Sequence, residues 1–295
     1  MRIAHINNIS GVASLLAEEQ RRLDYQTDVF VFNKKIFKQF GRDQIKYNYR
    51  SPISRWRFFR KLDGYDTWHY HYPYGSLKRS LEKRRHSDRI YLKHYHGDDL
   101  RGRQEDDFCV VSTPDLLKYA QNGKWLPNPI KVPDLAPRTT EQHNRIPRVA
   151  HYPHYKMYAA EDYYSHALKS LEDKKKCEVV RILHLPYDQA LATISTCDIV
   201  VGKILPSIGW IGKFELEAMA LGKPVIGFVS DELYEKYKPP LYRTTKESFR
   251  ADLEALLEDK NERDRLAVEG PAHIQENYNV QDIVKTLQTY YDNTG

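Results

Sequence analysis

The chain has 295 residues, of which 41% are hydrophobic and 29% are charged, and its formal net charge is +6. This length exceeds the usual size of one hydrophobic core, so we expect two domains, and the composition excludes a disordered or fibrous protein. No apolar run approaches the roughly 18 residues of a membrane span, and the apolar run at the start of the sequence is too short for a signal-peptide core. We therefore expect a cytoplasmic protein. Cys109, Cys177 and Cys197 lie far apart without a C-x-x-C pair, which argues against a disulfide framework or a zinc knuckle.

Charge is distributed unevenly along the chain. Residues 46–93 contain thirteen Lys or Arg against four Asp or Glu, an excess of +9, and aromatic residues are mixed into the run 55–61. Cations beside aromatic rings are typical of a segment at an anionic membrane surface, so one interpretation is peripheral contact with the inner face of a membrane. A solvated helix face is the alternative. Nucleic-acid binding is a third interpretation, but no nucleic-acid motif accompanies the charge, so we expect no such partner.

Short apolar runs alternate with amphipathic stretches from residue 3 onward. In the first half they predict strands at 3–6, 27–32, 65–70, 89–93 and 108–111, with a glycine turn at Gly11 and a helix from Val12. A proline-rich stretch follows. In the second half they predict strands at 148–151, 178–183, 198–201 and 224–229, helices around Leu168 and Leu191, and a helix that ends at Gly222. Thr244 and Glu247 have the spacing of a capping box ahead of Leu253.

This alternation of strands and helices predicts an α/β protein with two Rossmann-like, doubly wound parallel-sheet domains that face a cleft. We place the first domain at 1–135, a linker at 136–147, the second domain at 148–275, and at 276–295 a C-terminal helix that packs back toward the first domain. Parallel sheets of this kind bind ligands at the carboxyl ends of their strands.

The stretch 205–226 carries most of the chemistry. A glycine turn that includes Ser207 opens a helix, so free amides near Gly212, Lys213 and Phe214 can receive a phosphate or sugar oxygen, assisted by the positive end of the helix dipole. Glu217 lies about one turn further on. From there a carboxylate can accept hydrogen bonds from the vicinal diol of a ribose.

Residues 217–226, E-A-M-A-L-G-K-P-V-I, resemble the second half of the signature of retaining GT-B glycosyltransferases of the GT4 type (glycosyl transferases group 1). That signature is E-G-F-G, three residues, then E-A-M-A-x-G-x-P-V-I. Gly209 stands where the family has its first glutamate, so 209–212 resembles a G-W-x-G variant of the E-x7-E motif. The likeness continues at Gly11 and in four further segments, 66–71, 94–101, 111–117 and 125–129.

The resemblance implies transfer of a sugar from a nucleotide-diphosphate sugar to an acceptor hydroxyl, with retention and without an obligatory metal or cofactor. It implies that His96 and Glu217 are catalytic residues. It implies a set of donor-binding residues: Gly11, Val12, Lys156, Ser207, Gly212, Lys213, Phe214 and Glu217. It also implies acceptor or cleft residues: His71, Asp99 and Arg101. Ala159 occupies the position of one cation that the family places at the diphosphate, and Lys156, Lys213 or Lys203 are the cations that could compensate.

Other interpretations remain open at this point. Gly209 and Ala159 at two expected polar positions also suit a catalytically degenerate protein that binds a sugar nucleotide or a glycan. Glu217 and Lys156 could be surface charges, His96 a structural histidine and Gly11 a turn residue only. The H-x-H pairs His69/His71 and His94/His96 each share one face of a strand, but no carboxylate or cysteine ligand has convincing spacing nearby, so we expect no metal site.

Overall fold

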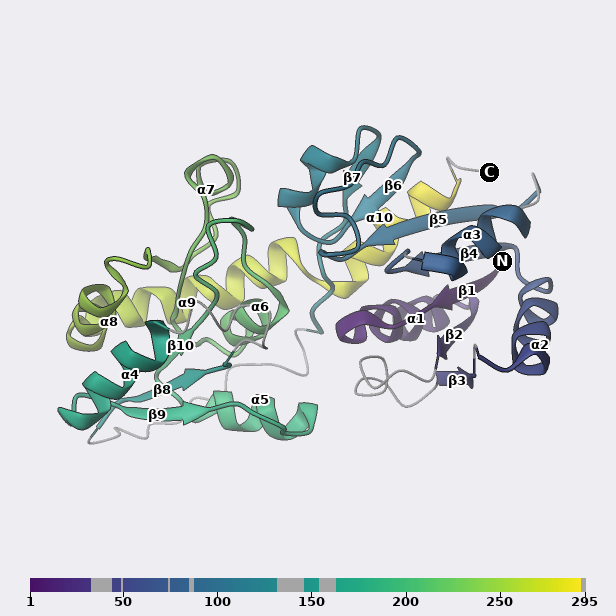
Figure 1. The fold of residues 1–295 in the computed structure, drawn as a ribbon. Coiled ribbons are helices and arrows are strands. Elements are labelled where there is room, and N and C mark those ends of the chain that lie inside the picture. Colours follow the sequence, from purple (N-terminus) through teal and green to yellow (C-terminus); the bar gives the residue numbers. More distant parts are fainter. Residues whose placement is uncertain are drawn as a thin grey trace. The chain divides into compact units, whose positions relative to one another are not determined.

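The structure is a computed structural model that describes residues 1–32, 44–48, 50–73, 75–84, 88–131, 146–153 and 163–292. The chain divides into two compact units (Figure 1). The first unit comprises Met1–Lys131 together with Tyr278–Gly295, and the second comprises Val132–Asn277. Most of the predicted linker, residues 136–145, lies outside the described residues. The last helix of the chain therefore belongs to the same unit as the first strand.

The first unit is built on a seven-stranded sheet with the order β3-β2-β1-β4-β5-β6-β7, in which every neighbouring pair is parallel. Its strands are β1 (Arg2–Ile6), β2 (Gln26–Phe32), β3 (Gln44–Tyr47), β4 (Thr67–His71), β5 (Ile90–Tyr95), β6 (Cys109–Val111) and β7 (Gly123–Trp125). Its helices are the 3-10 turns η1 (Ile9–Gly11) and η3 (Pro114–Tyr119), and α1 (Val12–Arg22), α2 (Pro52–Leu62), α3 (Gly75–Arg84) and α10 (Val280–Asp292).

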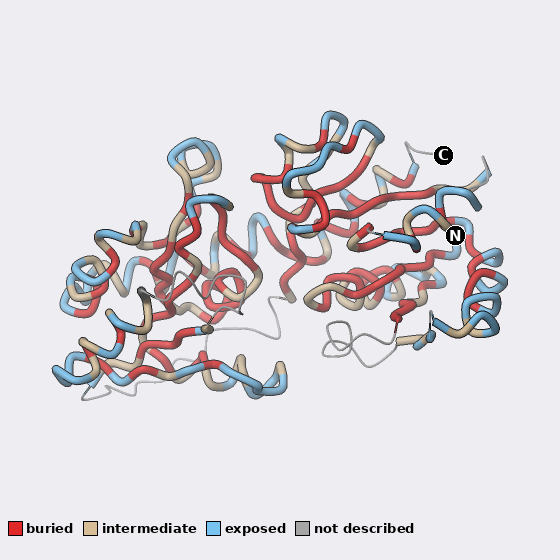
Figure 2. The backbone as a smooth tube through the Cα atoms, viewed as in Figure 1, coloured by how far each residue is buried: buried red, intermediate tan, exposed pale blue. Residues whose placement is uncertain are grey.

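Helix α10 packs on the first unit because one of its faces is apolar at helical spacing. Val280, Ile283, Val284, Leu287 and Tyr291 are buried in one cluster with residues of β1 and α1, among them Ile3, Val12 and Leu16. A second cluster gathers the aromatic residues of β2, β4 and α2, including Phe30, Phe58 and Trp68. Figure 2 shows that β1, β2, β4 and β5 are largely buried, whereas the outer face of α2 is exposed.

The second unit is built on a five-stranded parallel sheet with the order β12-β11-β10-β8-β9. Its strands are β8 (Arg148–His151), β9 (Glu178–Arg181), β10 (Ile199–Val201), β11 (Val225–Gly227) and β12 (Tyr242–Arg243). Its helices are α4 (Tyr163–Asp173), α5 (Tyr187–Ser195), α6 (Lys213–Ala220), α7 (Asp231–Tyr237), α8 (Phe249–Glu258) and α9 (Lys260–Asn277). Its core joins the strands to α4 and α8 through Leu168, Ile199 and Leu253.

The two doubly wound parallel sheets confirm the predicted fold class, and each strand predicted from periodicity is present. Strands β3, β7 and β12 were not predicted, because each is short and takes its register from the neighbouring strand. The capping box at Thr244 is wrong. Helix α8 begins at Phe249 with Ser248 as its N-cap, and the Thr244 hydroxyl donates instead to Asp252 Oδ2 (2.7 Å).

All three cysteines are buried and unpaired, and no described helix is long and apolar enough to cross a membrane.

Candidate active site

The amino end of α6 in the second unit is closed by a carboxylate from its own first turn. Glu215 is 1% exposed and accepts hydrogen bonds from the amides of Gly212 (2.9 Å) and Lys203 (2.7 Å). Gly202 makes room for it, since a Cβ there would lie 2.6 Å from Glu215 Cγ. The Gly212 amide, which we expected to be free for a donor oxygen, is therefore already bonded, and this corrects the prediction for that group.

Two lysines lie at the same end of α6. Lys203 Nζ sits against Gly212, where an added Cβ would collide with it. Lys213, the first residue of α6, places Nζ 3.0 Å from Glu217 Oε1. Positive charge at a helix amino terminus favours the binding of anions, because it adds to the partial charge of the helix dipole. This end of α6 is the part of the second unit best suited to a phosphate group.

Glu217 is oriented by two side chains. It is 7% exposed, and Oε1 accepts a hydrogen bond from the Tyr187 hydroxyl (2.6 Å) in addition to the Lys213 ion pair. The Lys213 ammonium also lies 5.3 Å from the centroid of the Tyr187 ring. Sequence reasoning missed Tyr187, because nothing in the spacing of α5 links it to α6. Both donors converge on one carboxylate oxygen, so the ionised carboxylate is held in a fixed orientation.

The turn ahead of α6 is shaped by Gly209. Its φ of +72° lies in the left-handed region, and a Cβ there would lie 3.2 Å from Ser230. Trp210 beside it is buried and packs edge-on against Tyr237. The position where the GT4 signature has its first glutamate thus has a backbone conformation that glycine adopts without strain and other residues do not. Ser207 is exposed, and the Phe214 ring lies 5.7 Å from that of Tyr152.

In the first unit, Gly11 ends a tight turn between β1 and α1. Its φ is +75°, and Asn7 and Ser10 also have positive φ. The Val12 side chain is fully buried in the core and its amide donates to the Ile9 carbonyl. Both the side chain and the amide of Val12, a predicted donor-binding residue, are therefore used inside the first unit.

The segment 96–101 forms a turn held by its own charged side chains. The Asp99 carboxylate accepts hydrogen bonds from the amides of His96 (3.0 Å) and Gly97 (2.7 Å). Burial raises the pKa of Asp99 to about 6, although these amides oppose the shift. Arg101 donates from Nε (3.0 Å) and Nη2 (2.8 Å) to Asp115. Asp99 and Arg101 were predicted as acceptor or cleft residues. Their carboxylate and guanidinium groups are used to build the turn that carries His96.

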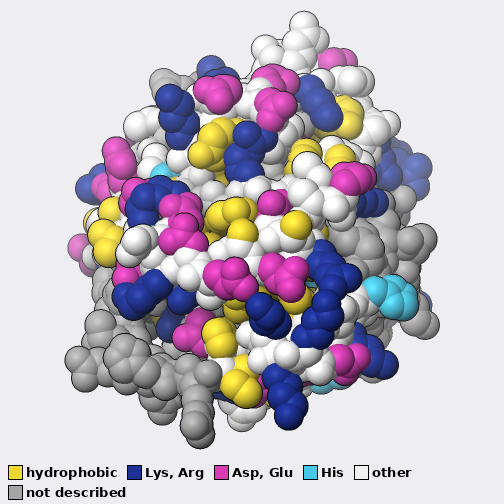
Figure 3. All heavy atoms as spheres, turned by 90° about the vertical axis from the view of Figure 1, so that its left-hand side faces the viewer, with side chains coloured by type: hydrophobic (Ala, Val, Ile, Leu, Met, Phe, Trp, Pro, Cys, Tyr) yellow, Lys and Arg dark blue, Asp and Glu magenta, His cyan; other side chains and the backbone are white. Residues whose placement is uncertain are grey.

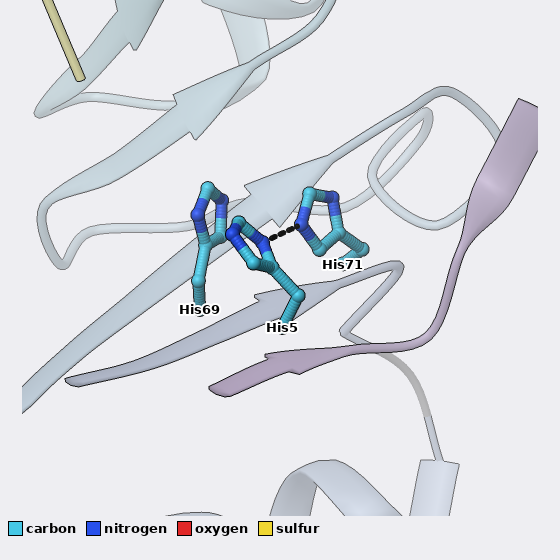
Figure 4. Close-up of side chains that lie close together, drawn as sticks. All are labelled: His5, His69 and His71. Carbon is cyan, nitrogen blue, oxygen red and sulfur yellow. Dashed lines mark hydrogen bonds between the residues drawn. The ribbon is translucent and has the colours of Figure 1, made fainter. Parts of the chain in front are cut away.

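Five histidines meet at the carboxyl ends of β1, β4 and β5. In register, His5 lies beside His69, and His71 lies beside His94. His5 Nδ1 is 2.9 Å from His71 Nε2 (Figure 4), His71 Nδ1 is 3.0 Å from His96 Nε2, and His69 Nε2 is 3.1 Å from His94 Nδ1. The Ser112 hydroxyl joins His94 Nε2 (3.1 Å) to His96 Nδ1 (2.6 Å). Sequence reasoning found the two H-x-H pairs but not His5 or Ser112, because only strand order makes them neighbours.

Gln20 of α1 and Tyr291 of α10 complete this network. Gln20 Oε1 lies 2.8 Å from His5 Nε2, and the Tyr291 hydroxyl lies 2.6 Å from His69 Nδ1. The Gln20 side chain also acts on the Tyr291 phenol, whose pKa it lowers against the effect of burial. We call this series of eight side chains, each hydrogen-bonded to the next, the imidazole cycle: Gln20, His5, His71, His96, Ser112, His94, His69 and Tyr291.

The histidines of the imidazole cycle are held in the neutral state. Burial lowers the pKa of His5 to about 4 and that of His96 to about 3. The pKa values of His69, His71 and His94 also lie well below the usual value, first because of burial and then because of the neighbouring imidazoles.

Two sets of three imidazoles have potential ligand atoms within 4.8 Å of one another: His5, His69 and His71, and His71, His94 and His96. These are the described residues that could hold a metal. In the arrangement observed, however, both nitrogens of every ring already have hydrogen-bonding partners. His69 and His71 stack at 4.2 Å with an interplanar angle of 16°, so their in-plane lone pairs run nearly parallel instead of converging on one point. The geometry is that of a hydrogen-bonded network.

Lys156, predicted to bind the donor, and Ala159, which occupies the position of an expected cation, both lie outside the described residues.

Part of the basic excess of 46–93 is used inside the first unit: Lys93 is 3% exposed and pairs with Glu105 (2.6 Å) and Asp107 (2.8 Å), and Lys78 pairs with Glu105 (3.1 Å). The outward basic charge of this stretch is therefore smaller than the sequence suggested.

Comparison with models of known protein families finds no match, and comparison with curated proteins finds none either. Solved structures do match over the whole chain. A glycosyltransferase from Rickettsia africae ESF-5 superposes with a TM-score of 0.68 at 10% identity, covering 99% of this chain and 98% of that one. A variant of S. aureus TarM, solved with fondaparinux, alpha-GlcNAc-glycerol and UDP, gives 0.61 at 9% identity, covering 98% and 99%. SnogD from Streptomyces nogalater gives 0.53 at 12% identity with the same coverage. Together with the two parallel sheets, this likeness shows that the chain has the two-domain fold of GT-B glycosyltransferases.

Proposed function

We propose that this protein is a glycosyltransferase that moves a sugar from a nucleotide-diphosphate sugar to an acceptor hydroxyl, with retention at the anomeric carbon and without a metal or other cofactor. One observation carries the proposal: Glu217, held by Tyr187 and Lys213, stands one turn into a helix whose amino end is lined by lysines. The neighbours in fold that are named glycosyltransferases support the class of reaction, and one of them was solved with UDP.

In this proposal the donor binds the second unit. Glu217 accepts hydrogen bonds from the ribose through the oxygen that Tyr187 does not use. Lys203 and Lys213 stabilise the negative charge that develops on the departing diphosphate, which is where fixed charge lowers the barrier most effectively. These two lysines supply the positive charge that the family places at the position of Ala159. Lys156 stays a candidate for the same role.

The acceptor binds the first unit, where His96 is presented by the Asp99 turn. The GT4 resemblance of the sequence supports both the assignment of His96 and retention. A hydroxyl of a glycan or of a lipid-linked substrate fits the proposed chemistry. Activity that persists in EDTA is the expected result for a reaction without a metal.

The test is a thermal-shift panel of UDP-, GDP-, ADP- and TDP-sugars on the wild type and on Glu217→Ala, with Glu232→Ala, an exposed carboxylate of α7, as the control. A ligand that binds the native state raises its stability in proportion to affinity and concentration. We expect one nucleotide class to raise Tm in the wild type and in the control but not in Glu217→Ala. A wild type that responds to none of them contradicts the proposal.

A degenerate binding protein is the second candidate, favoured by the left-handed Gly209 where the family has a glutamate. It predicts the same stabilisation by a sugar nucleotide. It differs in turnover, since neither transfer to an acceptor nor slow hydrolysis of the donor would occur.

We further propose that the protein works in the cytoplasm, at the inner face of a membrane that it touches through α2. Ser51 and Pro52 begin this helix, and its inner face buries Phe58 and Leu62. Ile53 and Trp56 on the outer face are 66% and 56% exposed, and the Arg60 guanidinium lies 5.2 Å from the Trp56 ring. Apolar side chains flanked by cations suit the interface of an anionic bilayer. By contrast, the face shown in Figure 3 interleaves basic and acidic side chains.

A further inference from the structure

The imidazole cycle has one member whose two hydrogen-bonding groups are not interchangeable. An amide oxygen only accepts a hydrogen bond and an amide nitrogen only donates one, whereas a neutral imidazole or a hydroxyl can do either. Gln20 Oε1 lies 2.8 Å from His5 Nε2 and can only accept from it. Gln20 therefore sets the direction of every other hydrogen bond in the cycle.

The direction can be followed link by link from Gln20. His5 must donate from Nε2 to Gln20 Oε1, so the neutral His5 accepts at Nδ1 from His71 Nε2. His71 in turn accepts at Nδ1 from His96 Nε2, and His96 accepts at Nδ1 from Ser112.

The remaining links run the same way. Ser112 accepts from His94 Nε2, His94 accepts at Nδ1 from His69 Nε2, and His69 accepts at Nδ1 from the Tyr291 hydroxyl. The Tyr291 hydroxyl is thus the last donor of the series. In each of these hydrogen bonds one donor meets one acceptor, and all five histidines carry their proton on Nε2.

We propose that Gln20 is a positioning residue that fixes His96 as a neutral imidazole protonated on Nε2, acting through His5 and His71. The assignment of tautomers follows from the hydrogen bonds alone, while the consequence for catalysis rests on the proposed function. His96 stands at the end of β5, next to the Gly97 turn, so its orientation is transmitted to the surface where the acceptor is proposed to bind.

Nitrogen-15 NMR of the imidazole rings in the full-length protein tests the assignment without any substrate. We expect five rings that are neutral and protonated on Nε2 at neutral pH and that stay so on acidification to about pH 5, since hydrogen bonding and burial both disfavour an added proton. Rings protonated on Nδ1 among these five, or titration close to pH 6.5, would overturn the proposal.

The Gln20→Glu variant tests the role of the amide. A carboxylate at position 20 adds a buried negative charge beside His5 Nε2. A buried charge is costly unless it has a partner of opposite charge, so an imidazole of the cycle should take up a second proton. We expect one imidazolium to appear in the NMR spectrum, whereas Gln26→Glu, the same exchange at an exposed site of β2, leaves all five rings neutral.

The Tyr291→Phe variant keeps the experiment decisive if the carboxylate prevents folding. It removes the hydrogen bond to His69 but leaves Gln20 Oε1 facing His5, so the direction from His5 to His96 should be unchanged. A changed tautomer of His96 in this variant would contradict the assignment to Gln20.

Activity completes the test once a donor has been identified. We expect Gln20→Glu to lower kcat at least about tenfold and to shift its pH profile, since a wrong tautomer in a catalytic network costs far more than a lost contact. The Tm shift caused by the donor should be unchanged, because Glu217 is untouched. Unaltered kcat and pH profile despite an imidazolium would overturn the catalytic role. A wild type without turnover would instead refute the proposed function, and the NMR result would still decide the tautomers.

Discussion

The Tyr187 hydroxyl donates a hydrogen bond of 2.6 Å to Glu217 Oε1, linking the first residue of α5 to the second turn of α6. Lys213 reaches the same oxygen at 3.0 Å. Two donors on one carboxylate oxygen leave the other oxygen for a ligand, which makes Tyr187 as informative about the proposed donor site as the glutamate itself.

Tyr187→Phe should weaken donor binding without unfolding the protein. The variant loses one charge-assisted hydrogen bond that orients Glu217, so we expect the Kd for the donor to rise about tenfold, equivalent to about 1.4 kcal/mol. Calorimetric titration measures this, with Tyr234→Phe on α7 as the control. An unchanged Kd would mean that the orientation of Glu217 does not matter for the donor.

Glu215→Ala should lower stability rather than affinity alone. Removing this buried carboxylate leaves the amides of Gly212 and Lys203 without their acceptor, and we expect a loss of about 3 kcal/mol in the free energy of unfolding. Urea denaturation measures the loss. Glu215→Gln retains one acceptor oxygen and should lose less, so equal losses in the two variants would argue against the capping role.

The imidazole cycle should make the protein acid-sensitive. The five histidines have folded pKa values below 6.5, so the unfolded chain binds more protons below that pH and the free energy of unfolding falls as the pH drops. Their stabilisation is complete above pH 6.5 and is lost progressively toward pH 4, by about 1.4 kcal/mol per pH unit for each histidine. Asp99, with its pKa raised to about 6, acts in the opposite direction and offsets about one of the five.

Urea denaturation at about pH 7.5 and pH 5.5 measures this dependence. His94→Gln should reduce the slope by about the share of one histidine, and His184→Gln, at an exposed position, should not change it. Equal stability at the two pH values would show that the buried histidines are not held neutral.

Trp56→Ala should weaken sedimentation with vesicles. If α2 lies at an anionic bilayer, the wild type sediments with vesicles that contain phosphatidylglycerol and not with phosphatidylcholine alone, and the variant sediments several-fold less. Val268→Ala is the matched control, since Val268 is an apolar residue of α9 with 73% exposure. Equal sedimentation of the wild type with both kinds of vesicle would contradict the proposed contact.

The sequence by itself determined the fold class, because alternating apolar runs and helical stripes are local patterns. The buried face of α10 could be read from the spacing of Val280, Ile283, Val284 and Leu287, and the strand Ile3–Ile6 from its short, mainly apolar run. The glutamate at 217 was equally accessible, since its motif is a continuous stretch of chain.

Only the tertiary structure decided which side chains meet. Strand order places His5 beside His69, 64 positions away, and brings Tyr291 from the last helix within 2.6 Å of the same ring. Contacts of this kind leave no periodic trace, because each depends on register between strands that are remote in sequence. For the same reason the sequence could propose His96, Asp99 and Arg101 as ligand contacts, while their packing assigned the first to the imidazole cycle and the other two to the turn that supports it.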